Sequence, residues 1–228
     1  MSETNMKFIA KISSDFPTKF GIPRQSGLVD AIQSTIIFEP EFREKNALRG
    51  LENFSHIWII WNFSESQRTT WSPTVRPPRL GGNTRLGVFA TRSPFRPNPI
   101  GLSCVKLIGL EETDQFGTVI HVAGADLMDG TPIYDIKPYI PYADSHPDAI
   151  GGFTDTAADY LLDVDFPDNL LEKIPESKRD ALKGVLSHDP RPSYQNDPDR
   201  IYGLTFSEYD IKFIIRDNRL TVINVKKI

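Results

Sequence analysis

Short runs in which apolar and polar residues alternate predict that most of this chain consists of β-strands. In the segment Phe8–Ile12 the residues Phe8, Ala10 and Ile12 share one face, which is the period-two pattern of a half-buried strand. The segment His56–Phe63 (HIWIIWNF) is rich in aromatic and β-branched residues, so it is predicted to be a buried central strand. The same patterns predict strands at residues 34–38, 86–90, 100–110, 118–122 and 133–136.

The connections between these strands are irregular, and the only helical signal among them is one or two turns at Glu41–Leu48. Short strands without intervening helices favour an antiparallel or mixed β-barrel. A Rossmann core needs strands that alternate with helices and a Gly-rich turn after its first strand, and this chain has neither pattern. We therefore predict a mainly β protein in which residues 1–145 form a β-barrel domain.

The last third of the chain has a different pattern. The segment Asn169–Leu186 is predicted to be helical, with an interruption at Pro175 and an apolar face in its second half. Strands are predicted at residues 201–206, 209–216 and 220–226. Asp217 and Asn218 tolerate the positive φ of a tight hairpin turn between the last two strands. Residues 146–228 are therefore predicted to form a small C-terminal α/β subdomain with a helix and a β-hairpin.

Composition adds limits on the class of protein. The chain has 228 residues, of which 39% are hydrophobic and 25% charged, as in an ordinary globular protein with one sizeable core. Its single cysteine, Cys104, lies in an apolar run and favours a reducing cytoplasm over an oxidising compartment. No stretch is apolar enough for a signal peptide or a membrane span. The isolated histidines have no metal-ligand spacing, so no metal is expected.

The charges are distributed unevenly. The formal net charge is −4, yet no acidic residue lies between Glu65 and Glu111. Arginine predominates among the cations of this window and suits bidentate contacts with phosphate or carboxylate. The cations are Arg68, Arg76, Arg79, Arg85, Arg92, Arg96 and Lys106. A cationic face for nucleic acid and a solvated surface balanced by acids elsewhere both agree with this pattern.

The most distinctive chemistry lies in Leu80–Ser103 (LGGNTRLGVFATRSPFRPNPIGLS). Pro94, Pro97 and Pro99 each fix their own φ and restrict the residue before them, so the loop is expected to be stiff. A stiff loop that carries arginines and an aromatic residue suits a site that grips an anionic or planar ligand.

Four motifs, in this order, resemble the TrmO/TsaA (YaeB-like) family of S-adenosylmethionine-dependent tRNA N6-methyltransferases. They are PRQ at Pro23–Gln25, RPPRLGG at Arg76–Gly82, RLGGNTRLGVFATRSPFRPNPIG at Arg79–Gly101 and DLMDGTPIYDIKPY at Asp126–Tyr139. The resemblance extends from about residue 8 to the DPRPSY motif at residues 189–194 and is general beyond it. It implies that the barrel is the methyltransferase domain and binds S-adenosylmethionine.

The resemblance also implies which residues bind this cofactor. They are Pro23, Arg24, Gln25, Ser64, Glu65, Arg92, Leu102, Asp126, Leu127, Met128 and Asp129. Some members of the family carry His-Gln where this chain carries Ser64-Glu65, so a backbone contact would be kept there and a side-chain contact would change. Arginines suit the cofactor's carboxylate, while acidic side chains suit its ammonium group and ribose hydroxyls.

The reaction implied is methyl transfer to N6 of threonylcarbamoyladenosine 37 in threonine tRNA, by a cytoplasmic homodimer. Asp135 is our candidate for the acceptor of the proton that leaves this nitrogen, with Asp129 as an alternative. The other interpretation of Asp135 is an ion pair with Lys137. Candidates for contacts with the tRNA anticodon loop, with Phe95 stacking on unpaired bases, are Arg76, Arg79, Phe95 and Arg96.

Two other interpretations stay open. A non-catalytic RNA-binding module would use the basic loops and bind no cofactor. A methyltransferase on the same scaffold that acts on a different small acceptor would bind the cofactor and have no salt-sensitive affinity for RNA.

Overall fold

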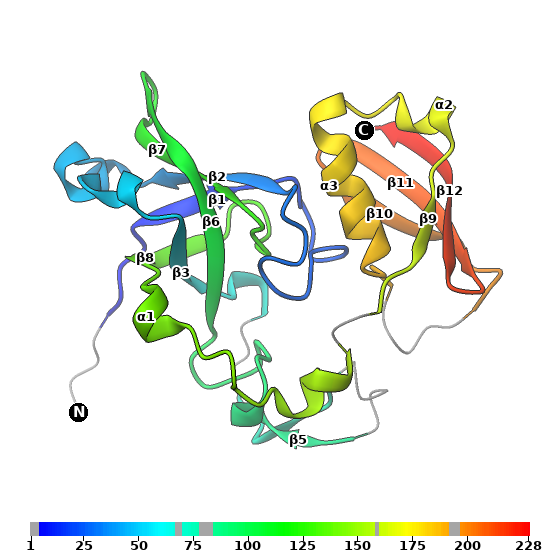
Figure 1. Cartoon of the computed structure of the whole chain (residues 1–228), viewed down its shortest axis with the longest axis horizontal. Coiled ribbons are helices and arrows are strands. Elements are labelled where there is room, and N and C mark those ends of the chain that lie inside the picture. The colour runs from blue at the N-terminus through cyan, green and yellow to red at the C-terminus, as the bar shows by residue number, and fades with distance from the viewer. Residues whose placement is uncertain (1–4, 67–69, 78–83, 158–159, 192–196) are drawn as a thin grey trace.

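The structure is a computed structural model that describes residues 5–66, 70–77, 84–157, 160–191 and 197–228. Six strands of its first part pair in a closed barrel in the order β1-β2-β7-β6-β3-β8, and each pair is antiparallel (Figure 1). The strands are β1 (Ala10–Ser13), β2 (Gln33–Phe38), β3 (His56–Asn62), β6 (Ile100–Thr113), β7 (Gly117–Ala123) and β8 (Pro132–Pro138). The prediction of a mainly β fold is confirmed.

The barrel core follows the alternation seen in the sequence. In β3 the side chains of Ile57, Ile59 and Trp61 are buried, and the strand lies between β6 and β8. β6 alternates buried and exposed residues from Ile100 to Ile108, because one face of the strand points into the barrel and the other points away from it.

Short turns of 3₁₀ helix connect the barrel strands. They include η1 (Pro40–Phe42), η2 (Lys45–Leu48), η3 (Leu51–Asn53) and η4 (Ser64–Ser66). The segment Glu41–Leu48, predicted as one or two helical turns, overlaps the first two of these.

The predicted strand at residues 86–90 is wrong over its second half. Only β5 (Leu86–Gly87) pairs, with β4 (Thr74–Val75), and residues 88–90 form the 3₁₀ turn η6 (Val88–Ala90). Val88 is buried whereas Phe89 is 71% exposed, and the N–H of Thr91 closes the turn by donating to the carbonyl of Val88. Because only one residue of this apolar run is buried, the run lacks the alternation of buried and exposed side chains that stabilises a strand in a sheet.

The C-terminal part is a four-stranded sheet in the order β10-β11-β12-β9. Before the predicted helix, where the sequence patterns predicted no strand, β9 pairs parallel to β12. Asp217 and Asn218 have φ of 47° and 63°, as predicted for the hairpin turn. The elements are α1 (Pro141–Asp144), η7 (Gly152–Ala157), β9 (Asp163–Asp165), α2 (Asp168–Leu171), α3 (Glu176–Ser187), β10 (Tyr202–Phe206), β11 (Tyr209–Arg216) and β12 (Arg219–Lys227).

The loop at residues 14–32 connects the barrel strands β1 and β2, yet its apolar side chains pack in the core of the C-terminal sheet. Phe16, Val29 and Ile32 are buried in one cluster with residues of α3 and of strands β10 to β12. Phe16 is fully buried, with its ring edge-on to Phe206 at 5.6 Å between centroids. In Figure 1 the loop, drawn in blue, lies between the barrel and this sheet.

Polar contacts fix the same loop. The backbone N–H of Ser207 donates to the carbonyl of Asp15 at 2.7 Å, and the Asp15 carboxylate pairs with Lys178 of α3. Gly21 has φ of 90°, and a Cβ there would come within 2.0 Å of Leu204. Only glycine fits this backbone so close to the sheet.

We predict that Phe16→Ala destabilises the protein by about 3–5 kcal/mol, the usual cost of emptying a fully buried phenylalanine site. Phe54→Ala, at a side chain that is 39% exposed, should cost about 1 kcal/mol or less. Urea denaturation followed by tryptophan fluorescence measures both. Equal losses for the two variants would show that the loop is not anchored as described.

Candidate functional site

A cavity of about 770 Å³ opens at the end of the barrel where β3 stops and β6 begins. Its walls come from segments far apart in the sequence, at residues 19–25, 61–66, 91–102 and 126–131. The loop at residues 14–32 supplies the first segment, the end of β3 the second, and the turn between β7 and β8 the last. The antiparallel pairing of the barrel brings these strand ends together.

Most of the residues predicted to bind a cofactor line this cavity. They are Pro23, Arg24, Gln25, Ser64, Glu65, Arg92, Leu102, Asp126 and Met128. Leu127 and Asp129 do not. Leu127 is fully buried in the barrel core, and the carboxylate of Asp129 accepts from the backbone N–H of Ser14 at 2.9 Å. Successive residues of the turn thus point to the cavity, into the core or onto the neighbouring loop.

Cationic side chains surround the cavity. The guanidinium of Arg92 donates to the side-chain oxygen of Gln25, which links the proline-rich loop to the PRQ motif. Arg96 donates to the backbone carbonyl of Thr91 at 3.2 Å. The ammonium group of Lys19 donates to the backbone carbonyl of Glu65. Lys19 is a cavity residue that the sequence patterns did not indicate, since it is an isolated lysine in an irregular loop.

Asp126 is the acidic group that reaches into the protected part of the cavity. Its Oδ1 accepts from the Ser103 hydroxyl at 2.5 Å. Burial raises the pKa of the Asp126 carboxyl, while the Ser103 hydrogen bond and the charge of Arg92 offset part of that rise. The other acid in the cavity wall, Glu65, is exposed. The site therefore combines a cationic surround with one carboxylate that is costly to ionise.

Asp135 is not part of this cavity. It lies on β8 opposite Ile60 of β3 and pairs with Lys137 at 2.8 Å, which is the alternative that the sequence left open. It lines a second cavity of about 580 Å³, together with Phe38, Phe42 and other residues. Its role as a proton acceptor remains a prediction that this placement does not support.

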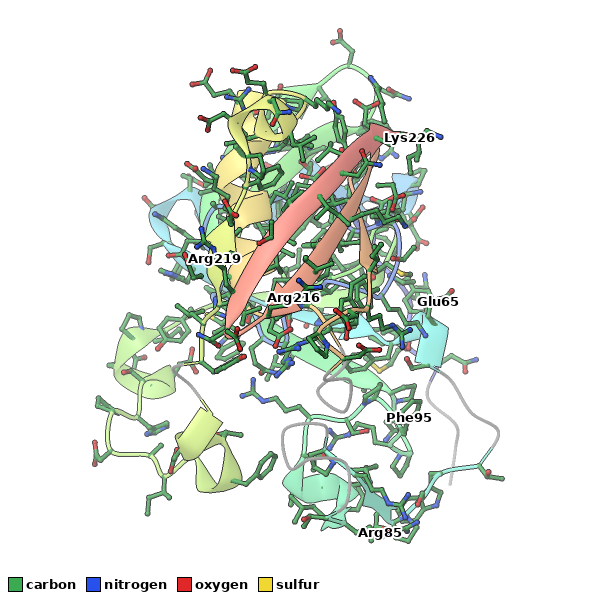
Figure 2. The ribbon with its side chains drawn as sticks, turned by 90° about the vertical axis from the view of Figure 1, so that its right-hand side faces the viewer. Glu65, Arg85, Phe95, Arg216, Arg219 and Lys226 are labelled. Atoms are coloured by element: carbon green, nitrogen blue, oxygen red, sulfur yellow. The ribbon has the colours of Figure 1, made fainter. Side chains whose placement is uncertain are left out.

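The residues predicted to contact RNA are spread over the basic segment, which is the stretch without acidic residues between Glu65 and Glu111. Arg96 lines the cavity, Phe95 is partly buried beside it, and Arg76 is exposed after β4. Arg79 lies outside the described residues. Figure 2 shows Phe95 between Glu65 and Arg85, with Arg85 at the lower extremity of the molecule.

Among the residues that the structure describes, His, Cys, Asp and Glu nowhere gather in threes or more around a point that could hold a metal ion. Within the same ranges, no helix has the length and apolar character needed to cross a membrane.

These features define a mainly β protein with a binding cavity at one end of a strand barrel, suited to a ligand that carries both anionic and cationic groups. The chain belongs to the tRNA-methyltransferase O family. The model of that family's N-terminal domain matches residues 11–145, and the model of the TrmO C-terminal domain matches residues 159–228.

Individual proteins agree with this assignment. The chain is 38% identical over 225 residues, 95% of each protein, to the tRNA (adenine(37)-N6)-methyltransferase of Escherichia coli K12. It is 39% identical over 211 residues, 89% of each, to a protein of Pseudomonas aeruginosa PAO1 named putative S-adenosylmethionine-dependent methyltransferase RcsF. The crystal structure of TrmO from Pseudomonas aeruginosa superposes with a TM-score of 0.81 at 33% identity, over 99% of both chains.

The raised pKa of Asp126 generates a prediction about stability. The folded state binds the Asp126 proton more tightly than the unfolded state, so stability falls as pH rises from the unfolded pKa of about 3.9 through the higher folded pKa. Asp126→Asn removes this penalty and keeps an oxygen for the Ser103 hydroxyl. The variant should therefore melt at a higher temperature than the wild type at neutral pH.

The difference should shrink as the pH falls through about 4 and below, because the wild-type carboxyl then becomes protonated in the folded and the unfolded state alike. Thermal denaturation across this range measures it. Asp135→Asn is the control, since a surface ion pair contributes about 1 kcal/mol or less. A destabilised Asp126→Asn at every pH would contradict the assignment of burial as the dominant effect.

Proposed function

We propose that this protein is an S-adenosylmethionine-dependent tRNA (adenine(37)-N6)-methyltransferase. The observation that supports this most is the convergence of the PRQ motif, the proline-rich loop and the turn at residues 126–131 on one cavity. The relative in Escherichia coli that matches nearly the whole chain carries this activity in its name. We further propose threonylcarbamoyladenosine 37 of threonine tRNA as the acceptor.

The residues of the cavity fit S-adenosylmethionine. Its volume of about 770 Å³ lies within the usual range of about 300–1,000 Å³ for small-molecule sites. Arg24 and Arg92 would hold the cofactor's carboxylate. Asp126 would accept hydrogen bonds from its ammonium group or ribose, and the indole of Trp61 with Leu102 would provide an apolar wall for adenine.

The bound cofactor would supply the methyl group. The chain itself would hold the acceptor nitrogen in line with that group, and positioning of this kind accounts for much of the rate of a displacement. The threonylcarbamoyl acceptor carries a carboxylate, and the guanidinium of Arg96 and the ammonium group of Lys19 are the cations available for it at the cavity.

The acceptor would approach over the basic segment. Arg76 is exposed, and Arg85, held by a hydrogen bond to Thr74 at 2.8 Å, belongs to the same β4–β5 unit. The exposed ring of Trp71 lies 6.2 Å from that of Phe89. Arginines and exposed aromatic rings on one segment suit an RNA loop whose bases are unstacked.

We also propose that the protein is a cytoplasmic homodimer whose barrel and C-terminal parts divide near residue 145. The outer face of β6 supports the dimer, because Ile100, Leu102 and Ile108 are 36%, 54% and 52% exposed. Ile100 and Leu102 also line the cavity, so a second copy on this face would border the site.

Ile108→Asp would place a charge on that face, away from the cavity, and should convert a dimer into a monomer. Light scattering of the purified protein measures its mass directly. A wild-type mass equal to that of a single chain would remove the dimer proposal.

The first functional prediction is that the protein binds S-adenosylmethionine without added metal and that Arg92→Ala weakens binding about ten- to a hundredfold, the range for loss of a charged hydrogen-bonding partner. Arg85→Ala, outside the cavity, is the matched control and should leave affinity unchanged. Titration calorimetry measures both. RNA binding without any heat of cofactor binding would favour the non-catalytic RNA-binding module.

The second functional prediction is that the affinity for tRNA falls steeply as the salt concentration rises, because binding releases counterions. Arg76→Ala should reduce the slope of log K against log salt by about 1 and leave cofactor affinity unchanged. Lys45→Ala, which removes a surface partner of Glu112, is the control. Filter binding over a salt series measures the slopes. A salt-independent affinity, together with cofactor binding, would favour a different small acceptor.

A further inference from the structure

Ser103 is a buried polar residue of the barrel wall and is not among the predicted site residues. It lies on β6 opposite Ile59 and is 1% exposed. Its Oγ accepts from the indole N–H of Trp61 at 3.0 Å and donates to Oδ1 of Asp126 at 2.5 Å. The three side chains come from β3, β6 and the turn after β7, so they form a chain of hydrogen bonds across three elements.

Trp61, at the buried end of this chain, has little freedom to move. It lies opposite Gly101 in the β3–β6 register, and a Cβ at residue 101 would come within 2.2 Å of the indole. The ring of Phe63 lies 4.2 Å away between centroids. The indole therefore occupies space that only glycine leaves free, and the direction of its N–H is fixed.

A fixed donor at Trp61 determines where the Ser103 hydroxyl points. A serine hydroxyl can rotate about its C–O bond and has two acceptor lone pairs and one hydrogen. Because the indole N–H occupies a lone pair, the hydrogen is directed at Asp126. A distance of 2.5 Å is that of a hydrogen bond from a hydroxyl to a carboxylate. This contact opposes the effect of burial on the Asp126 carboxyl.

Other charged groups also face Asp126. Arg92 lowers the pKa of its carboxyl, and backbone N–H groups of Ser26 and Asp126 itself act in the same direction. Around the same cavity the remaining charged side chains are Lys19, Arg24, Glu65 and Arg96. Of these contacts, the one from Ser103 has the largest effect in keeping the carboxyl ionised.

We propose that Ser103 is a positioning residue: held by the Trp61 indole, its hydroxyl aims the Asp126 carboxylate into the cavity and keeps it charged for the cofactor. This rests on the proposed function, because it assumes that S-adenosylmethionine is the ligand that Asp126 meets. Ser103 itself is not assigned a contact with the cofactor.

The test is the affinity for S-adenosylmethionine, measured by calorimetry over a range of pH. Ser103→Ala should weaken binding about tenfold at neutral pH, near the lower end of what a hydrogen bond to a charged group contributes. It should also move the acidic fall in affinity to higher pH, because the contact that lowers the pKa of Asp126 is gone. Ser34→Ala, at another buried serine of the barrel that lies outside the cavity wall, should change neither.

A second pair of variants tests the indole. Trp61→Phe keeps an aromatic ring and removes the N–H, so it should move the acidic fall in the same direction by a smaller amount. Trp58→Phe on the same strand is the control, because the Trp58 N–H donates to Asp144 outside the cavity. If Ser103→Ala does not fold, this pair decides the question.

The outcomes separate the inference from the function on which it rests. A wild type that binds no S-adenosylmethionine at any pH would refute the proposed function. If the wild type binds and Ser103→Ala behaves like Ser34→Ala, or weakens binding without moving its pH dependence, Ser103 is only structural and the inference is overturned.

Discussion

The burial of the loop at residues 14–32 in the C-terminal core is the interaction on which the rest of this structure depends. Phe16, Val29 and Ile32 give up contact with water in a cluster made mostly of α3 and the C-terminal strands, and full burial of such side chains is worth about 1.5–3 kcal/mol each. The same loop carries the PRQ motif into the cavity wall. The C-terminal sheet therefore shapes the site through this loop.

Barrel closure is the second constraint. Antiparallel pairing puts the end of β3 beside the start of β6, and the turn after β7 reaches the same end of the barrel, where Asp126 contacts Ser103. A carboxylate there loses water, and its hydrogen bonds to a serine and to backbone N–H groups offset part of the cost. The cavity has a charged group in a protected place because β6, the loop at residues 14–32 and the turn after β7 each supply one of these donors.

The sequence predicted strand positions well and side-chain partners poorly. Alternation located β3, β6 and the final hairpin, where Asp217 and Asn218 have positive φ. It failed at residues 88–90 and missed β9, whose strand of three residues is too short to show a period. Alternation tells which face of a strand a residue occupies but not which end of the barrel it reaches. For this reason the sequence does not show that Asp135 lines a different cavity from the predicted cofactor-binding residues. The chemistry of the proline-rich loop indicated one wall of the cavity, the other walls were indicated only by the family resemblance, and Ser103 had no signal.

The dependence of the cavity wall on the C-terminal sheet has a consequence for the order of events on the ribosome. Synthesis proceeds from the N-terminus, and domains generally fold as they emerge. The last barrel strand, β8, ends at Pro138, whereas the core partners of Phe16 extend to Val225. A nascent chain can complete the barrel while this loop still has no core to enter. The protein would then acquire a finished binding site only when its final strand has left the exit tunnel.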